Sequence, residues 1–312
     1  MANYTTAADI IDDALFRAHE PTDGTSDLDG AALSYLNRAH RALCLGGGEL
    51  VPGMQEDWWW LRAEGVLTLD PIQATGSADV TNNSANVTLN GIVTASAYIG
   101  WHFKAATHED VFKVTAGASA LLTLESAYTG NTTASCVYRL MHFDYDLAST
   151  AFKLISPMHA YQGRQYMVYQ TTLDRLHYEY PQPGDGIPQK FAPLDDNTVR
   201  FSHAGSLTSG EYVKMTYDYV MLPTDMTNAT TVAPLVPLMW RHVLSDWVLY
   251  YLASDKDEQR AADYLNIARN GVMAMQKENR ARWAQTGRPG KIEYRQRQVR
   301  GGIFTDSGKL IR

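Results

Sequence analysis

A chain of 312 residues can bury one large core or two smaller ones, and 45% hydrophobic with 20% charged residues is ordinary for a globular protein. The apolar runs fall short of the roughly 18 residues that cross a bilayer, and the N-terminal residues do not resemble a signal peptide. The two cysteines, Cys44 and Cys136, lack metal-ligand and redox-motif spacing, which predicts free thiols in a reducing compartment.

Charge is distributed unevenly along the chain. The formal net charge is −7, yet residues 280–312 hold nine Lys or Arg and only two acids, Glu293 and Asp306. That segment therefore carries +7 and leaves −14 on the rest of the chain. An acidic body with a basic arm is typical of an assembly subunit that reaches onto an acidic neighbour or onto nucleic acid.

A first helix is expected over residues 5–19, because its apolar residues recur at the spacing of a helix buried on one face. Thr5 or Thr6 is the predicted N-cap, since a hydroxyl can accept a bond from a free backbone N–H. The predicted apolar stripe consists of Ala8, Ile11, Leu15 and Ala18.

A second helix is expected to begin at Asp27 or Asp29 and to end at the glycines 46–48, as helices commonly do. The triple glycine is not a phosphate loop, because no Lys-Ser or Lys-Thr follows it. The predicted stripe consists of Ala32, Leu33, Leu36, Ala39 and Leu43.

Three consecutive tryptophans, Trp58, Trp59 and Trp60, begin an apolar stretch that continues to Leu69. Alternating aromatic residues at the start of a strand can cover both faces of a sheet. Core packing is the favoured interpretation, and a subunit interface is the alternative, because tryptophan is enriched in binding hot spots.

Residues 73–140 form a region rich in Thr, Ser, Asn, Ala and Gly, with short apolar runs between turn residues. Regular short strands separated by turn signals predict a small all-β sandwich or barrel, inserted into the chain as a module. The six predicted strand runs are 79–81, 86–89, 102–104, 111–114, 120–124 and 135–140.

Beyond the module, residues 152–155 predict a strand, and a short helix or helices are expected from Pro157 to about Leu176. Residues 198–201 and 211–219 alternate in polarity, which predicts an antiparallel strand pair. Pairing of residues 145–155 with residues 198–220 would enclose the segment between them and would bring the N- and C-terminal helices into one core.

A helical pair is predicted from about Leu235 to Trp283, with Pro234 and Pro237 near its first turn. Asp255 followed by Glu258 resembles a capping box and predicts where the second helix begins. The predicted stripes are Val236, Trp240, Val243, Leu244, Trp247, Val248, Tyr251 and Leu252, then Ala261, Leu265, Ala268, Val272 and Met275.

Motifs for catalysis, for metals and for nucleotide cofactors are not found in the sequence. The nine histidines are scattered, and each is interpreted as a surface or satisfied polar residue. Neighbouring acids such as Asp9, Asp12 and Asp13 predict a solvated helix face or an electronegative contact surface. We therefore expect no enzyme, no metal and no cofactor.

The C-terminal segment 285–312 interleaves basic residues with apolar and aromatic ones. Three interpretations remain open: an arm that docks on a neighbour, a disordered tail and a nucleic-acid-binding arm. The apolar residues near its end, among them Phe304 and Ile311, favour docking, because a purely solvating tail would not need them.

The order of these features resembles the head-to-tail adaptor, or connector, proteins of tailed bacteriophages. The likeness covers nearly the whole chain and lies in order and pattern rather than in one diagnostic motif. It is carried by the N-terminal helices TTAADIIDDALFRA and AALSYLNRAHRAL, the aromatic stretch after Trp58, the β insertion and the closing pair PLVPLMWRHVLSDWVLYYLASDKDEQRAADYLNIA.

The resemblance implies an α+β fold, a helical bundle with antiparallel strands, an inserted β module and an extended C-terminal arm. It divides the chain into an adaptor core of residues 1–72 and 141–284, the inserted module 73–140 and the basic arm 285–312. The residues that it implies for portal binding by the arm are Arg288, Lys291, Tyr294, Arg295, Arg297, Arg300, Phe304 and Ile311.

The implied function is structural. Copies of the chain would form a ring, expected to be a dodecamer, in the virion neck after assembly in the host cytoplasm. The partners implied are the portal protein, a tail or nozzle protein and further copies of this chain, with no membrane. Double-stranded DNA would pass through the ring without specific binding, because Lys and Arg contacts to phosphate supply most nonspecific affinity and the body is acidic.

Two alternatives come from other functional classes. The β module could make this a carbohydrate- or receptor-binding tail protein, although its aromatic residues mostly fit strand-core positions. A tail-associated hydrolase is the third hypothesis, since the two carboxylates of a glycosidase leave no sequence motif. The aromatic residues expected in the core are Tyr98, Trp101, Phe103, Phe112 and Tyr128.

Overall fold

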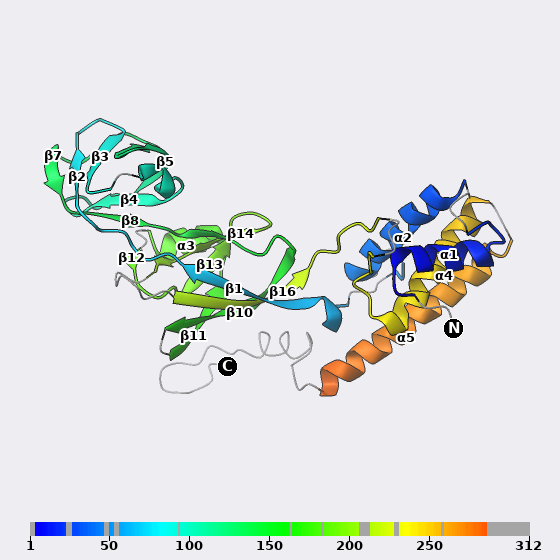
Figure 1. The fold of residues 1–312 in the computed structure, drawn as a ribbon. Helices are drawn as coiled ribbons and strands as arrows, with labels where there is room; N and C mark the ends of the chain where they lie inside the picture. Colours follow the sequence, from blue (N-terminus) through cyan, green and yellow to red (C-terminus); the bar gives the residue numbers. More distant parts are fainter. Residues whose placement is uncertain are drawn as a thin grey trace, which may run out of the picture. The chain divides into compact units, whose positions relative to one another are not determined.

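The protein is described by a computed structural model that covers residues 4–22, 27–46, 50–52, 56–92, 94–162, 164–181, 184–205, 213–227, 231–256 and 259–285. Within these residues it has five helices and two seven-stranded sheets, so the predicted α+β class is confirmed (Figure 1). None of these helices is long and apolar enough to cross a bilayer.

The chain separates into two compact units. The helical unit is built from the described parts of Met1–Arg62 and Leu222–Arg312, and the strand-rich unit is Ala63–Met221. Residues 63–72 and 141–221, expected to belong with the helices, instead share the strand-rich unit with the predicted module. A helical bundle is therefore not the framework of the whole chain, because the strands form cores of their own.

The helical unit is organised around α4 (Arg241–Asp255), which contacts α1 (Ala7–Arg17), α2 (Asp29–Cys44) and α5 (Ala261–Gln285). Every residue from Val243 to Leu249 is buried. The prediction that this helix is buried on one face is therefore wrong, because its neighbours enclose it on all sides.

The start of α4 lies against the middle of α5. The Trp240 indole Nε1 donates to Glu278 at 2.8 Å, and a Cβ on Gly271 would come within 2.8 Å of Val243. The two helices thus pack closely in the antiparallel arrangement that their short connection predicts. Pro237 precedes a 3₁₀ turn, Leu238–Trp240, so α4 begins later than expected.

Helix α1 is capped as predicted by Thr6. Its hydroxyl accepts from the Asp9 backbone N–H at 3.2 Å, and the Asp9 carboxylate accepts from the Thr6 N–H at 2.8 Å. The buried stripe is rotated from the predicted one and excludes Ala8 and Ala18. It consists of Ala7, Ile10, Ile11, Ala14 and Leu15.

The predicted aspartate cap of α2 is wrong, because Leu28 occupies the N-cap position and no side chain caps the helix. Asp29 lies instead in the first turn, where its charge favours the helix dipole. Gly46 follows the end of the helix with φ 107°, a conformation that glycine adopts readily. The other two glycines of the run, and Glu258 of the predicted capping box, lie outside the described residues.

One sheet of the strand-rich unit is a half-barrel with a buried concave face. Met158, Val168 and Met215 lie in its core, on three neighbouring strands. Its strands in spatial order are β1 (Arg62–Leu69), β16 (Val213–Met221), β10 (Ala151–Gln162), β11 (Arg164–Gln170), β13 (Lys190–Pro193), β14 (Thr198–Phe201) and β9 (Asp144–Asp146).

Two predictions about this sheet are wrong. The helix expected from Pro157 is mostly the hairpin β10–β11, in which Met158 and Ala160 are buried on either side of a half-buried His159. Only α3 (Leu173–Glu179) is helical there. Strand β14 pairs with β13 and β9, and β16 pairs with β10, so the two predicted strands exist but are not partners.

The second sheet is a nearly closed barrel, which confirms the predicted β module. All six predicted runs form strands, and the last divides into two strands that flank the sheet at its two ends. In spatial order they are β7 (Thr133–Cys136), β2 (Ser77–Val80), β3 (Asn86–Asn90), β6 (Leu121–Leu124), β5 (Phe112–Ala118), β4 (His102–Ala105) and β8 (Tyr138–Met141). As predicted, Phe103, Phe112 and Tyr128 are buried in this barrel, and Tyr98 and Trp101 pack partly buried against it.

The barrel packs on the half-barrel at the two segments that connect them, one around Ile72 and one around Phe143. Phe143 and Ala204 from the half-barrel side form a small core with Ile72, against which Val111 of the barrel packs. His142 Nδ1 lies 2.7 Å from Asp70 Oδ2, and the His142 ring stacks on Trp101 at 5.0 Å. These contacts join the two sheets within one compact unit.

A polar network in the helical unit generates a first prediction. Arg17 Nη1 lies 2.8 Å from Asp246 Oδ1 on α4 and 3.4 Å from Asp13 Oδ2, and Ser245 and Tyr4 donate to the same Asp13 carboxylate. The side chain of Asp246 is 10% exposed. Arg17 therefore compensates two carboxylates that lie largely away from water.

We expect Arg17→Ala to lower the free energy of unfolding of the helical unit by on the order of 3 kcal/mol, because it leaves both carboxylates without a cation. Urea unfolding followed by far-UV circular dichroism measures this. The matched control is Arg41→Ala, whose pair with Asp225 is exposed, and whose loss should be under about 1 kcal/mol. Equal losses in the two variants would contradict the role given to Arg17.

Candidate functional site

A cavity of about 600 Å³ lies in the strand-rich unit, where barrel loops face α3 and β14 of the half-barrel side. We call it the cleft. Its volume is within the range of small-molecule sites in proteins. The residues that line it are His102, Asp110, Val111, Phe112, Ser126, Thr129, Phe143, Leu176, His177, Tyr180, Pro181, Arg200, Phe201 and Ser202.

Arg200 is fixed in the cleft by Asp144, its partner in the register between β14 and β9. Its Nε and Nη2 atoms donate to the two carboxylate oxygens at 2.6 and 2.7 Å, a bidentate pair. These hydrogen bonds raise the pKa of Arg200 above its usual value. The remaining nitrogen, Nη1, lies 3.5 Å from His177 Nε2 and is the part of the guanidinium left for further contacts.

His102 contributes a neutral imidazole. Burial, followed by the nearby Arg200 charge, lowers its pKa to about 4. Its ring meets Phe143 edge-on at 5.2 Å, and its Nδ1 is buried without a hydrogen-bond partner among the described residues. The positive charge in the cleft is therefore that of Arg200, which Asp144 already balances.

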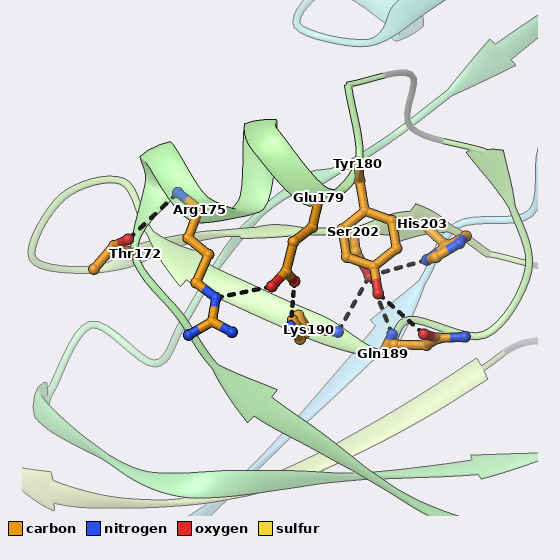
Figure 2. A network of polar contacts seen from close by, with 8 residues as sticks. All are labelled: Thr172, Arg175, Glu179, Tyr180, Gln189, Lys190, Ser202 and His203. Atoms are coloured by element: carbon orange, nitrogen blue, oxygen red, sulfur yellow. Dashed lines mark hydrogen bonds and ion pairs between the residues drawn. The ribbon is translucent and has the colours of Figure 1, made fainter.

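Helix α3 positions one wall of the cleft through a chain of polar contacts (Figure 2). Thr172 caps the helix by accepting from the Arg175 N–H, and Leu176 is buried beneath it. Glu179 pairs with Lys190 on β13 and with Arg175, and the hydrogen bonds from these two cations lower its pKa. The helix is thus tied to the sheet just before Tyr180.

Ser202 is the centre of a second group of contacts in Figure 2. Its Oγ accepts from the backbone N–H groups of Gln189 and Lys190 at 3.1 and 3.2 Å, and lies 2.9 Å from His203 Nδ1. Since two donors occupy the oxygen, its own proton goes to His203. The Tyr180 hydroxyl donates to Gln189 Oε1 at 3.0 Å, so the same group holds the aromatic wall.

These contacts leave the Ser202 oxygen without the free lone pair that a nucleophile uses. The residue is also only 1% exposed. Its hydroxyl joins two strands and orients the neighbouring imidazole, which is a positioning role. The two backbone donors and the low exposure of Ser202 therefore support a positioning role for Ser202 and His203.

At the rim, Thr129 meets His108 and Asp110. His108 Nε2 lies 2.7 Å from Thr129 Oγ1 and 3.2 Å from Asp110 Oδ2, and the Thr129 hydroxyl donates to Asp110 at 3.0 Å. In a nucleophilic triad the carboxylate holds the other ring nitrogen. Here both groups contact the same nitrogen, so the arrangement fixes the Asp110 carboxylate rather than activating the hydroxyl.

Within the part of the chain that is described, no three His, Cys, Asp or Glu side chains are grouped so that they could hold a metal ion. Both cysteines are buried free thiols, as predicted, and burial raises the pKa of Cys44 to about 12. The cleft offers hydrogen-bonding groups and aromatic walls, which suit binding.

The predicted arm contacts all lie outside the described residues, so their role stays a prediction. They are Arg288, Lys291, Tyr294, Arg295, Arg297, Arg300, Phe304 and Ile311.

The three tryptophans lie in the helical unit and begin a 3₁₀ turn, Trp59–Leu61, so the predicted strand start there is wrong. Trp58 is 1% exposed, stacks on Trp60 at 4.5 Å and donates its Nε1 to the Leu43 carbonyl at 2.6 Å. Trp59 and Trp60 are partly exposed, and the guanidinium of Arg282 lies over Trp59. A subunit interface formed by the three tryptophans stays a prediction, and Trp58 itself is buried in the core.

Sequence reasoning did not identify the cleft. His102, His177 and Arg200 come from three different elements, β4, α3 and β14, and only the folding of the chain brings them together. The signal that could have indicated Arg200 is a charged residue between Val199 and Phe201, which are both buried in a predicted strand. Such a residue must face away from the core of its sheet.

The chain matches no protein-family model and no curated protein at a significant level.

The environment of His102 generates a prediction about acid stability. Because its pKa is about 4 in the folded chain and near 6.5 when exposed, the unfolded chain binds the proton more tightly. The contribution of neutral His102 to the free energy of unfolding is therefore fully present above about pH 6.5. It is lost as the pH falls toward 4, by at most roughly 1.4 kcal/mol for each pH unit.

His102→Leu removes this proton and the unpaired Nδ1 while keeping an apolar side chain of similar size against Phe143. We expect the unfolding free energy of the strand-rich unit to depend less on pH in this variant than in the wild type between pH 6.5 and 4. Urea unfolding at several pH values measures the difference. Parallel pH curves for the two proteins would contradict the assignment of this proton to His102.

Proposed function

We propose that the protein is a structural component of the neck of a tailed bacteriophage, where copies form a ring between the portal vertex and the tail. The ring extends the DNA channel and offers a platform for the next tail component. The observation that carries the proposal is the way the chain is divided, with both of its ends contributing to one helical unit.

This division suits a subunit that must contact more than one partner. The strand-rich unit is inserted between Arg62 and Leu222, so it can be presented to one neighbour without interrupting the helical unit. Helix α5 ends at Gln285, where the basic segment 286–312 follows. We propose that this basic segment binds a second neighbour, the portal.

The charge distribution supports passage of DNA through such a ring. Residues 1–279 carry −14, and Lys and Arg contacts to phosphate supply most nonspecific affinity for DNA. In the helical unit, burial together with the nearby Asp29 and Asp9 raises the pKa of Asp12, which indicates a crowded acidic face. A surface of this kind repels a phosphate backbone.

A structural role is also supported by the two contacts between a hydroxyl and an imidazole group described above. The hydroxyl of Ser202 is saturated by backbone donors, and Thr129 shares one imidazole nitrogen with Asp110. Neither has the arrangement of a hydrolytic nucleophile. These contacts therefore argue against a hydrolase whose nucleophile is Ser202 or Thr129.

Removal of residues 286–312 tests the proposed role of the arm. We expect the truncated chain to keep its far-UV circular dichroism and its unfolding midpoint, because the described cores do not include the arm. We expect it to lose binding to purified portal rings, measured by co-sedimentation. The matched variant replaces Arg295, Arg297 and Arg300 by Gln within the full-length chain, and it should bind more weakly and with less dependence on salt.

Portal binding that survives the truncation would contradict the role given to the arm. A truncated chain with altered circular dichroism would instead show that the arm belongs to the fold.

A further inference from the structure

We propose that the cleft is a binding site for a short, uncharged saccharide. This inference concerns the strand-rich unit and does not rest on the neck function. It follows from three properties of the cleft: its size, the kinds of polar groups that line it and the balance of charge within it.

The cleft has a volume of about 600 Å³ and walls from separate elements. The volume lies within the range of roughly 300–1,000 Å³ typical of small-molecule sites. One wall comes from the barrel, at Asp110 and Ser126, and the other from α3 and the residues after it, at His177 and Tyr180. Groups on opposite walls can therefore contact two edges of one ligand.

Its polar groups match neighbouring hydroxyls on a sugar ring. The Asp110 carboxylate is 58% exposed, and its Oδ2 is held by the Thr129 hydroxyl and by His108 Nε2, so its Oδ1 is left to accept from a ligand hydroxyl. The Nη1 atom of Arg200 is a donor whose direction is fixed by the bidentate pair with Asp144. Planar groups held in place by their neighbours lose little conformational entropy when they bind.

Aromatic and apolar surface complements these polar groups. Tyr180 is held by its hydrogen bond to Gln189 and by its edge contact with His203, whose ring centroid is 5.1 Å away. Phe112 lines the facing wall. A sugar ring presents C–H groups on its faces and hydroxyls around its edge, so a cleft with aromatic walls and polar groups between them fits both.

The balance of charge in the cleft argues against phosphates and nucleotides, the other common class of small ligand. A phosphate or nucleotide site needs cations that remain free to bind the anion. In the cleft, Asp144 balances Arg200, burial keeps His102 neutral, and Asp110 adds negative charge at the rim. The only Lys or Arg among the described residues that line the cleft is thus already paired, while the cleft offers hydrogen bonds to a neutral ligand with many hydroxyls.

The test begins with the full-length protein on an array of bacterial-surface oligosaccharides, followed by calorimetric titration of the tightest-binding neutral glycan. We expect Asp110→Asn to weaken the affinity about tenfold or more, because it replaces a charged acceptor in direct contact with the ligand. The control is Asp196→Asn, the same change at an exposed turn outside the cleft, which should leave the affinity unchanged.

Arg200→Lys is a second variant, which keeps a positive charge beside Asp144 but removes the Nη1 donor, and we expect it to weaken binding similarly. Absence of binding to every glycan on the array would overturn the proposal. So would a glycan whose affinity is the same in Asp110→Asn, Asp196→Asn and the wild type, because that glycan would bind elsewhere.

Discussion

The helical unit depends on the burial of the middle of α4. Residues Val243–Leu249 are enclosed by three other helices, two of which come from the N-terminal end of the chain. Because α4 cannot be covered without α1 and α2, the chain must return after residue 221 to the helical unit that α1 and α2 belong to. That constraint makes residues 63–221 an insertion, and it also brings Arg17 to the buried Asp246.

Within the inserted unit, the barrel and the half-barrel are joined by two chain segments that contact each other. The segments that lead into and out of the barrel are held together by the His142–Asp70 contact and by the small core around Phe143. The cleft exists because this junction sets barrel loops opposite α3 and β14. On the half-barrel side its polar groups are positioned by the Asp144–Arg200 pair and the Ser202 hydrogen bonds, and on the barrel side by the contacts among Thr129, His108 and Asp110.

Sequence patterns predicted the local elements better than their partners. The barrel strands follow from short alternating runs with turn residues, and the cap of α1 follows from Thr6 and Asp9. Periodicity could not show that α4 is buried all round, since its apolar stripe alone matches a one-sided helix. Nor could it find the β10–β11 hairpin, because Pro157 in the sequence suggests the start of a helix. The cleft was not predictable, because residues far apart in sequence meet only through the pairing of β14 with β9.

We propose that this chain joins head to tail, and electron microscopy of particles from a phage that lacks this gene is the measurement that decides this. We expect DNA-filled or leaking heads without tails, which regain tails when the purified protein is added. Normally tailed particles that fail to adsorb to cells would contradict it. That result would assign the protein to receptor binding, with the strand-rich unit as the part that recognises the cell surface.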